Sequence, residues 1–454
     1  MTKIVIIGVG STSFGPSILG DLFSYAASLR GSNVWLVDIN PESLSMMTQL
    51  ARRVNDSVDQ AFEFHSTTDR REALPGADFV IVSVAVDRIP AWRLDWQIPL
   101  KHGVRHVLGE NGGPGGLSHA IRNIPLLLSI AHDIEELAPK ALLLNFTNPM
   151  SRLCLALSKH SKVRFVGLCH QIGKGYYLVN EVLKLVEPIA GETEAALRRR
   201  IEERIHLTAA GLNHFTFILD MRDRQTGTDL YPVFRNKVKA MPPDFELMSR
   251  RLMDAYGLFC ATGDGHAGEY VGFASETIPL TGYNFDGYEK RSLEQRERVR
   301  AVADGRAPIE LQLSGERAIQ IIDAVTHDLL QNELAVNIPN NGCISNLPDD
   351  ALVEVPGVVS GRGVQGVQVG PLPEGLAAML RQQVDIQKLV VEAGVKGDRH
   401  AALQALLLDP TVHSYAQAKY MLDELLTVHA RYLPQFYPSP QPFSQRERGR
   451  GEGV

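Results

Sequence analysis

The stretch KIVIIGVGSTSFGP, residues 3–16, decides the fold that we predict for this chain. It starts as a run dominated by β-branched residues, as in a strand buried on both faces of a parallel sheet, and this run ends at Gly8. A glycine-rich turn follows, and a helical pattern covers residues 18–23. Strand, glycine turn and helix in this order are the context of a dinucleotide-binding fingerprint, although Ser13 stands where its third glycine is expected.

An acidic residue ends the next apolar run, residues 33–37. Asp38 stands at the C-terminal tip of this second predicted strand, where a carboxylate accepts hydrogen bonds from an adenine ribose. We therefore predict that Gly8, Gly10, Ser11 and Asp38 bind a dinucleotide, with a purely structural glycine turn as the alternative. Because no arginine stands beside Asp38, we expect NAD rather than NADP.

Strand and helix patterns alternate up to about residue 190, which predicts an α/β fold with a Rossmann-type, doubly wound, mostly parallel sheet. The further strands are expected at residues 62–65, 77–84, 104–108, 140–146 and 163–168. The C-terminal tips of strands in such a sheet share one edge. Asn148 and Cys169 follow two of these strands, so we expect both to face the crevice that holds the cofactor.

The glycine-rich segment 109–116 leaves two interpretations open. So many glycines in one loop either permit a ligand to approach the backbone closely or only shape a tight turn.

From about residue 191 the alternation weakens, which predicts an NAD-binding domain over 1–190, an α+β domain over 191–433 and a loose tail over 434–454. A strand pair at residues 205–218 places His214 in an apolar setting, where a core histidine is the alternative to a ligand.

Two further features stand out in this second part of the chain. Residues 352–356 are expected at a sheet edge because Pro356 ends the run. Segment 259–270 gathers Asp264, His266 and Tyr270 among glycines, and a helix start capped by Asp264 is the structural alternative there.

Composition excludes several classes of protein. The chain has 454 residues, 44% hydrophobic and 22% charged, with a net charge of -6 and no basic face suited to nucleic acid. No apolar run is long enough to span a membrane, and the first apolar run is too short for a signal peptide. The four cysteines lack framework spacing, so we expect a reducing cytoplasm.

Several short motifs, in order along the chain, resemble those of glycoside hydrolase family 4, the NAD- and manganese-dependent glycosidases. The matching segments are Gly8 to Ser11, Gly112 to Gly116 with Arg122, Asn145 to Pro149, Gly167 to His170, Gly211 to Phe215, Asn340 to Pro348, and Val353 to Pro356. The resemblance implies a Rossmann-type domain followed by an α+β domain, distantly like lactate and malate dehydrogenases.

The resemblance also implies a set of site residues. Cys169 and His214 look like the ligands of Mn²⁺, while Asn148 and Asn213 look like contacts to the substrate. For the general base we choose Asp264, with Tyr270 in reserve, and His170 is expected to protonate the leaving oxygen.

The chemistry implied by the family is redox-assisted elimination rather than a two-carboxylate mechanism. NAD⁺ takes hydride from C3 of the sugar, which acidifies the C2 proton; Mn²⁺ stabilises the enediolate formed when a base removes that proton. The glycosidic oxygen then leaves, water adds at C1, and the hydride returns.

The dipeptide Cys169-His170 resembles the family members that act on non-phosphorylated α-glycosides of galactose, glucose or their uronic acids. Segment 265–270, followed by Ala274 and Glu276, resembles the galacturonidase branch. Members of the family assemble as dimers or tetramers, so we expect a homodimer or homotetramer. Two alternatives stay open: a 2-hydroxy-acid dehydrogenase on the same fold, and a non-catalytic NAD-binding sensor.

Overall fold

The first strand lies inside the parallel part of the sheet, as its β-branched residues predict. The computed structural model describes residues 1–169, 171–277, 283–310 and 313–437. In it β1 (Lys3–Ile7) pairs in parallel with β2 (Asn33–Val37) on one side and with β4 (Phe79–Val82) on the other. Side chains of β1 alternate between two hydrophobic cores: Ile4 and Ile6 join one, Val5 and Ile7 the other.

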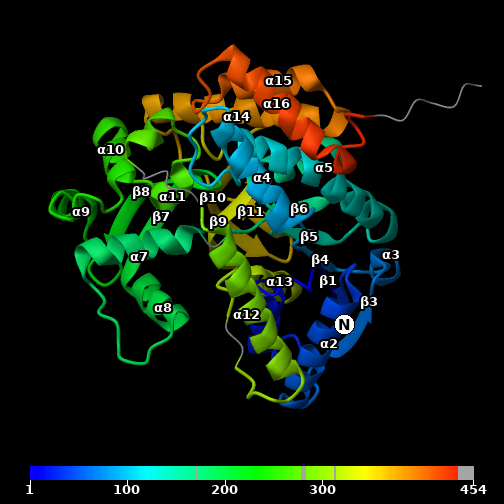
Figure 1. Cartoon of the computed structure of the whole chain (residues 1–454). Coiled ribbons are helices and arrows are strands. Elements are labelled where there is room, and N and C mark those ends of the chain that lie inside the picture. The colour runs from blue at the N-terminus through cyan, green and yellow to red at the C-terminus, as the bar shows by residue number, and fades with distance from the viewer. Residues whose placement is uncertain (170, 278–282, 311–312, 438–454) are drawn as a thin grey trace, which may run out of the picture.

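The described part of the chain folds around one 11-stranded sheet in the order β3-β2-β1-β4-β5-β6-β9-β10-β7-β8, with β11 paired to β10 (Figure 1). The remaining strands are β3 Glu63–Thr67, β5 Leu142–Asn145, β6 Arg164–Gly167, β7 Ile205–Leu212, β8 Phe215–Asp223, β9 Gln331–Pro339, β10 Leu352–Ser360 and β11 Gly363–Gly366. The order β3-β2-β1-β4-β5-β6 is that of a doubly wound fold, so the predicted fold class is confirmed.

Helices cover both faces of the sheet. Helices from the second half of the chain pack against helices from the first half. They are α1 Gly15–Ser24, α2 Pro41–Asp56, α3 Arg70–Ala73, α4 Arg88–Lys101, α5 Gly113–Leu137, α6 Met150–His160, α7 Gln171–Leu183, α8 Glu194–Arg204, α9 Tyr231–Val238, α10 Leu247–Tyr256, α11 Gly263–Ala267, α12 Phe285–Ala303, α13 Ala318–Thr326, α14 Glu374–Lys396, α15 Arg399–Leu408 and α16 Tyr415–Val428. Figure 1 shows α12 beside α2, where Arg296 and Arg300 both pair with Glu42. Among the described helices none is long and apolar enough to cross a membrane.

The sheet does not stop where the first predicted domain ends. Strand β9 joins β6 in an antiparallel bridge, Gly167 to Asn337, and one hydrophobic core contains residues from both sides of position 190. The antiparallel strands of the second half therefore extend the parallel sheet of the first. The division at residues 190 and 191 stays a prediction.

Two local expectations need correction. No strand forms at residues 104–108, because the indole N–H groups of Trp92 and Trp96 donate to the carbonyls of Leu108 and Val107, both at 2.9 Å. Strand β10 lies inside the sheet, between β9 and β7, because the chain passes Pro356 through a bulge and continues pairing.

The predicted tail begins with packed residues. Gln435 donates to the carbonyls of Ile121 and Gly394, at 3.0 and 3.1 Å, so the chain is held to α5 and α14 at this point. Residues 438–454, the rest of that segment, lie outside the described part of the chain.

A buried ion pair joins α4 to α5. Arg122 donates through both terminal nitrogens to the carboxylate of Asp95, at 2.8 and 2.5 Å, and His429 lies 3.0 Å from the same carboxylate. Burial alone would raise the pKa of Asp95, but the adjoining Arg122 and His429 hold this pKa well below its usual range. This interaction links helices from both ends of the chain.

Replacing Asp95 with alanine should lower the free energy of unfolding by about 3–5 kcal/mol at neutral pH, because the Arg122 guanidinium is left buried without its partner. Because the pKa of Asp95 is lower in the folded state than in the unfolded one, its contribution is present above about pH 4 and lost as the pH falls through the folded pKa. Urea unfolding of both proteins at several pH values measures this difference. A difference that widens toward acid pH would contradict the assignment.

Candidate active site

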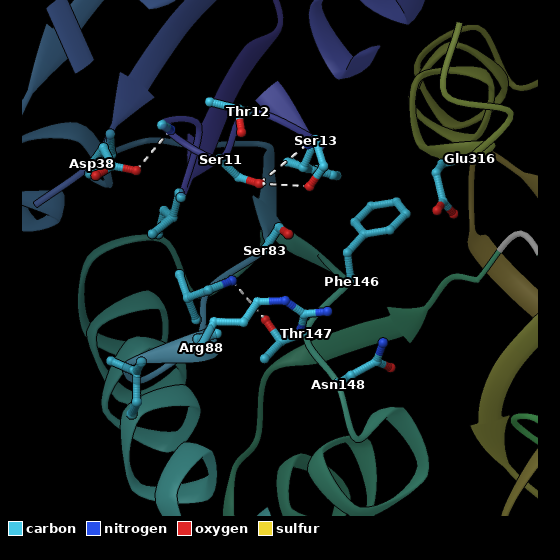
Figure 2. A pocket seen from close by; sticks show the side chains of 18 of the residues that line it. Ser11, Thr12, Ser13, Asp38, Ser83, Arg88, Phe146, Thr147, Asn148 and Glu316 are labelled. Atoms are coloured by element: carbon cyan, nitrogen blue, oxygen red, sulfur yellow. Dashed lines mark hydrogen bonds between the residues drawn. The ribbon is translucent and has the colours of Figure 1, made fainter. Parts of the chain in front are cut away.

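The nucleotide end of the site is built from the tips of β1 and β2. Gly8 has a φ of +89°, and a Cβ added to it would lie 2.0 Å from the carbonyl oxygen of Ser83, so only glycine fits here. The amide of Gly10 donates to Asp38 at 2.8 Å, which brings the predicted turn and the predicted acid together (Figure 2). Ser11 lies beside them and contacts Ser13 at 3.2 Å.

Gly15, rather than residue 13, takes the place of the third glycine. A Cβ on Gly15 would lie 2.0 Å from the carbonyl oxygen of Val9, and α1 begins at this residue. The glycine needed for close contact between turn and helix is thus present, two positions later than the motif predicts. Ser13 is exposed in the turn, where a side chain causes no clash.

The metal-ligand candidates lie together at the far end of the same edge. Cys169 follows β6, and His214 occupies the two-residue turn between β7 and β8. The Cys169 Sγ and the His214 Nε2 lie 3.3 Å apart, although 45 residues separate them in sequence. His214 adopts the left-handed region with a φ of +64°, which is uncommon for a residue with a side chain.

Hydrogen bonds to a buried carboxylate hold the His214 turn. Asn213 donates to Glu354 at 2.7 Å, and Thr216 donates to the other oxygen of this carboxylate at 2.6 Å. Glu354 is 1% exposed and lies on β10, between the strands that lead to Cys169 and to His214. The carboxylate of Glu354 therefore holds the residues on both sides of His214 in place.

The surroundings of Cys169 favour its protonated thiol. Burial raises the pKa of Cys169 well above its usual value, and the carboxylates of Glu316 and Glu354 act in the same direction. A cation at this place would favour the thiolate, because the positive charge offsets these contributions.

One cavity of about 1010 Å³ connects both ends of the site. Gly10 and Asp38 line one end, and Asn148, Cys169 and His214 line the other, as the shared sheet edge predicts. Figure 2 shows Asn148 beside Thr147 and Phe146, with Arg88 reaching toward them and Glu316 across the cavity from Asp38. Sequence reasoning gave Arg88 and Glu316 no role, since neither belongs to a motif of known spacing.

Among the described residues, Cys169 and His214 are the two predicted metal ligands that the cavity brings together. Within the described part of the chain no group of three or more His, Cys, Asp and Glu side chains is arranged to hold a metal ion. Cys169 and His214 leave further coordination positions to water or to oxygens of a substrate, as in catalytic sites that keep open positions. His170, the predicted acid, lies outside the described residues.

The structure places Asp264, the predicted base, at the start of α10. Its carboxylate accepts from the amides of Met248 and Ser249, at 2.9 and 2.7 Å, in the first turn of α10. Asp264 is also absent from the described residues that line the cavity. Asp264 therefore caps a helix, as the structural alternative predicts. The helix that it caps is α10, which precedes Asp264 in the chain.

Two other predicted residues lie behind the cavity wall. The side chain of Asn213 is buried against Glu354, so it does not reach the cavity as a substrate contact would. Tyr270 is 4% exposed, its ring stacks on Phe215, and its hydroxyl donates to the Asn213 carbonyl at 3.4 Å. Tyr270 is therefore next to the His214 turn but outside the described lining.

The glycine-rich loop binds a protein carboxylate. The amides of Glu110, Asn111 and Gly112 donate to Glu269 Oε2 at 3.0, 2.6 and 2.8 Å. A Cβ on Gly112 would lie 2.5 Å from the Glu269 carbonyl oxygen, so the glycine permits this close packing. Of the two interpretations, the tight turn describes this loop. Its contact with Glu269 could not be predicted, because Glu269 lies 157 to 159 residues later in the chain.

Comparison with known proteins agrees with this geometry. The family model described as family 4 glycosyl hydrolase matches residues 3–203, and the model of its C-terminal domain matches residues 209–412. The chain belongs to glycosyl hydrolase family 4. Membership of this family makes it a hydrolase and does not favour the dehydrogenase alternative.

Relatives of this family 4 hydrolase are similar over nearly their whole length. An alpha-glucosidase of Erwinia rhapontici is 34% identical over 95% of the chain and 99% of the relative. An alpha-galactosidase of Bacillus subtilis is 31% identical over 96% of the chain and 100% of the relative. Both resemblances therefore include the Cys169 and His214 regions.

Solved structures support the fold. A 6-phospho-alpha-glucosidase from gut microorganisms, in complex with NAD and glucose-6-phosphate, is 25% identical, with a TM-score of 0.80 over 96% of the chain and 99% of that structure. A malate dehydrogenase of Plasmodium falciparum has a TM-score of 0.50 at 12% identity, over 87% of the chain and 99% of that structure. The expected likeness to this dehydrogenase fold is confirmed.

Replacing Asp264 with alanine should destabilise the protein by about 1 kcal/mol and change turnover by less than about threefold, because the residue caps α10. Loss of a general base would instead lower kcat by about 10²- to 10⁴-fold. Thermal unfolding and steady-state turnover measure the two effects. Asp398→Ala is the matched control, since Asp398 caps α15 through the amides of His400 and Ala401.

Proposed function

We propose that this family 4 hydrolase cleaves non-phosphorylated α-glycosides of galactose, glucose or a uronic acid, with NAD and Mn²⁺ as cofactors. The observation that carries the proposal is the 3.3 Å approach of Cys169 Sγ to His214 Nε2, in a cavity that also reaches Asp38. A thiol and an imidazole beside a nucleotide turn match the cofactor set of a redox-assisted glycosidase. The relatives named alpha-glucosidase and alpha-galactosidase favour an α-linked, non-phosphorylated sugar.

The nucleotide end fits NAD. Gly8, Gly10 and Ser11 would hold the diphosphate at the start of α1, and Asp38 would accept from the adenine ribose. Each oxygen of Asp38 accepts one backbone amide, from Gly10 and from Asn40, and each has a further lone pair for a hydroxyl. The relative from gut microorganisms was crystallised with NAD on the same fold.

The other end fits a divalent cation. A thiolate and an imidazole together suit borderline transition metals, and resemblance to the family selects Mn²⁺ among them. When bound, NAD would accept hydride from C3, and the metal would polarise the sugar oxygens at C2 and C3. Cys169 and His214 would hold the cation from one side, leaving the other side to the sugar.

Side chains of the chain itself would orient the sugar and move the proton from C2. Asn148 lines the cavity, and its Oδ1 accepts from the Met150 amide at 3.3 Å, so the amide nitrogen is the group presented for a hydroxyl. Tyr270 stays the reserve candidate for the base from the sequence, and its hydroxyl lies next to the His214 turn, behind the described cavity lining. Burial raises the pKa of Tyr270 well above its usual value, and the nearby Arg152 opposes this shift.

The remaining roles stay predictions from the sequence. His170 would protonate the leaving glycosidic oxygen, and the sugar is to be chosen among galactose, glucose and their uronic acids. A cytoplasmic location and assembly as a homodimer or homotetramer are likewise untested.

Hydrolysis of a p-nitrophenyl α-glycoside should require both NAD⁺ and Mn²⁺, without net formation of NADH, because the hydride returns to the sugar in each turnover. Simultaneous recording of nitrophenol at 405 nm and NADH at 340 nm, on α-galactoside, α-glucoside, α-galacturonide and α-glucuronide, measures this and identifies the sugar. Steady accumulation of NADH without nitrophenol would instead support a dehydrogenase.

Replacing Cys169 with serine should weaken Mn²⁺ binding by at least about 100-fold, since the thiolate is one of two protein ligands. Electron paramagnetic resonance of free Mn²⁺ during titration measures the dissociation constant. Cys343→Ser is the matched control, because Cys343 is a buried thiol that is absent from the described cavity lining. Equal metal binding by wild type and Cys169→Ser would refute the assignment.

A further inference from the structure

A second histidine covers the His214 ring. His266 lies on the short helix α11, and its ring stacks on that of His214 with centroids 4.3 Å apart and planes 25° apart. Both rings line the cavity. His266 belongs to the segment 265–270 that resembles the galacturonidase branch, but the sequence assigned it no role.

His266 lies next to the carboxylate that the glycine-rich loop binds. Its Nδ1 lies 3.6 Å from Glu269 Oε1, while Glu269 Oε2 accepts the three loop amides of residues 110–112. Glu269 is 1% exposed, so this carboxylate is fixed at the N-terminus of α5. A continuous set of contacts therefore runs from α5 through Glu269 and His266 to the His214 ring.

Glu354 and His266 act on different degrees of freedom of His214. Glu354 holds the backbone of the turn through Asn213 and Thr216. It does not restrict rotation of the imidazole about χ2, which is a soft torsion in histidine. Stacking by His266 restricts this rotation, and the orientation of the ring decides whether Nε2 faces Cys169.

We propose that His266 is a positioning residue for the metal site: by stacking on His214 it keeps the Nε2 atom directed at the cation held with Cys169. The proposal rests on the proposed function, since it assumes that His214 binds the metal. Partners that orient a ligand from outside the coordination sphere usually change metal affinity by about 10- to 100-fold when removed.

The test is Mn²⁺ affinity in the absence of sugar, by electron paramagnetic resonance, for wild type, His266→Ala and His266→Phe. We expect the alanine variant to bind about tenfold more weakly or worse, and the phenylalanine variant, which retains a stacking ring, to stay within about threefold of wild type. Far-UV circular dichroism and the melting temperature establish that each variant is folded.

His65→Ala is the matched control. His65 also stacks on an aromatic ring, that of Trp35 at 4.8 Å and 20°, and also pairs with a glutamate, Glu63 at 3.0 Å, but on the edge strand β3. It should leave Mn²⁺ affinity unchanged, which separates stacking on His214 from the general loss of a stacked histidine.

Wild-type affinity in His266→Ala would overturn the proposal, and so would a phenylalanine variant that binds as weakly as the alanine variant, because stacking would then not be the cause. Cys169→Ser in the same titration separates this result from failure of the proposed function. If wild type and Cys169→Ser bind Mn²⁺ alike, the metal site itself is absent, and both proposals fall.

Discussion

The site depends on the hydrogen bonds that the buried carboxylate of Glu354 accepts. It accepts from Asn213 and Thr216 on one side and from Asn337 at 3.2 Å on the other. The same Asn337 amide donates to the Gly167 carbonyl at 3.3 Å, two residues before Cys169. One polar network thus joins the end of β6 to the turn after β7. A buried network of this kind is stable only when its groups find partners, which makes the geometry specific as well as strong.

This network explains why the site lies at the junction of the two halves of the chain. Parallel strands bring the tips after β1, β2, β5 and β6 to one edge, and Cys169 follows the last of them. Antiparallel strands β9, β10 and β7 extend the same sheet and return a turn to that edge. His214 reaches Cys169 because the sheet continues across the expected domain boundary.

The fold class could be predicted because the signals for it are local. A β-branched strand, a glycine turn and an acid at the next strand tip depend on neighbours in sequence, and even the shift from residue 13 to Gly15 left the turn recognisable. The failed strand at residues 104–108 depended on two indoles supplied from α4. Pro356 indicated an edge, and only the register of β9 against β10 reveals the bulge that accommodates it.

The common placement of Asp38, Asn148 and Cys169 at one cavity could be predicted, because each follows a parallel strand and the tips of these strands share one edge of the sheet. The place of Asp264 could not be predicted, because its partners, the amides at the start of α10, lie 15 and 16 residues earlier in the chain. The sequence does not show whether an aspartate caps a helix or contacts a substrate.

A metal bound by Cys169 and His214, as we propose, needs these two side chains to be oriented by their surroundings. When three or four side chains bind a metal, the metal itself fixes the orientation of each imidazole ring. When only two bind it, rotation of one imidazole removes one of the two bonds between protein and metal. Cys169 adds to this demand, because burial and the carboxylates of Glu316 and Glu354 favour its protonated form. The cation therefore competes with a proton at one ligand and depends on ring orientation at the other. Packing around His214 is, on this argument, as much a part of the site as the ligands.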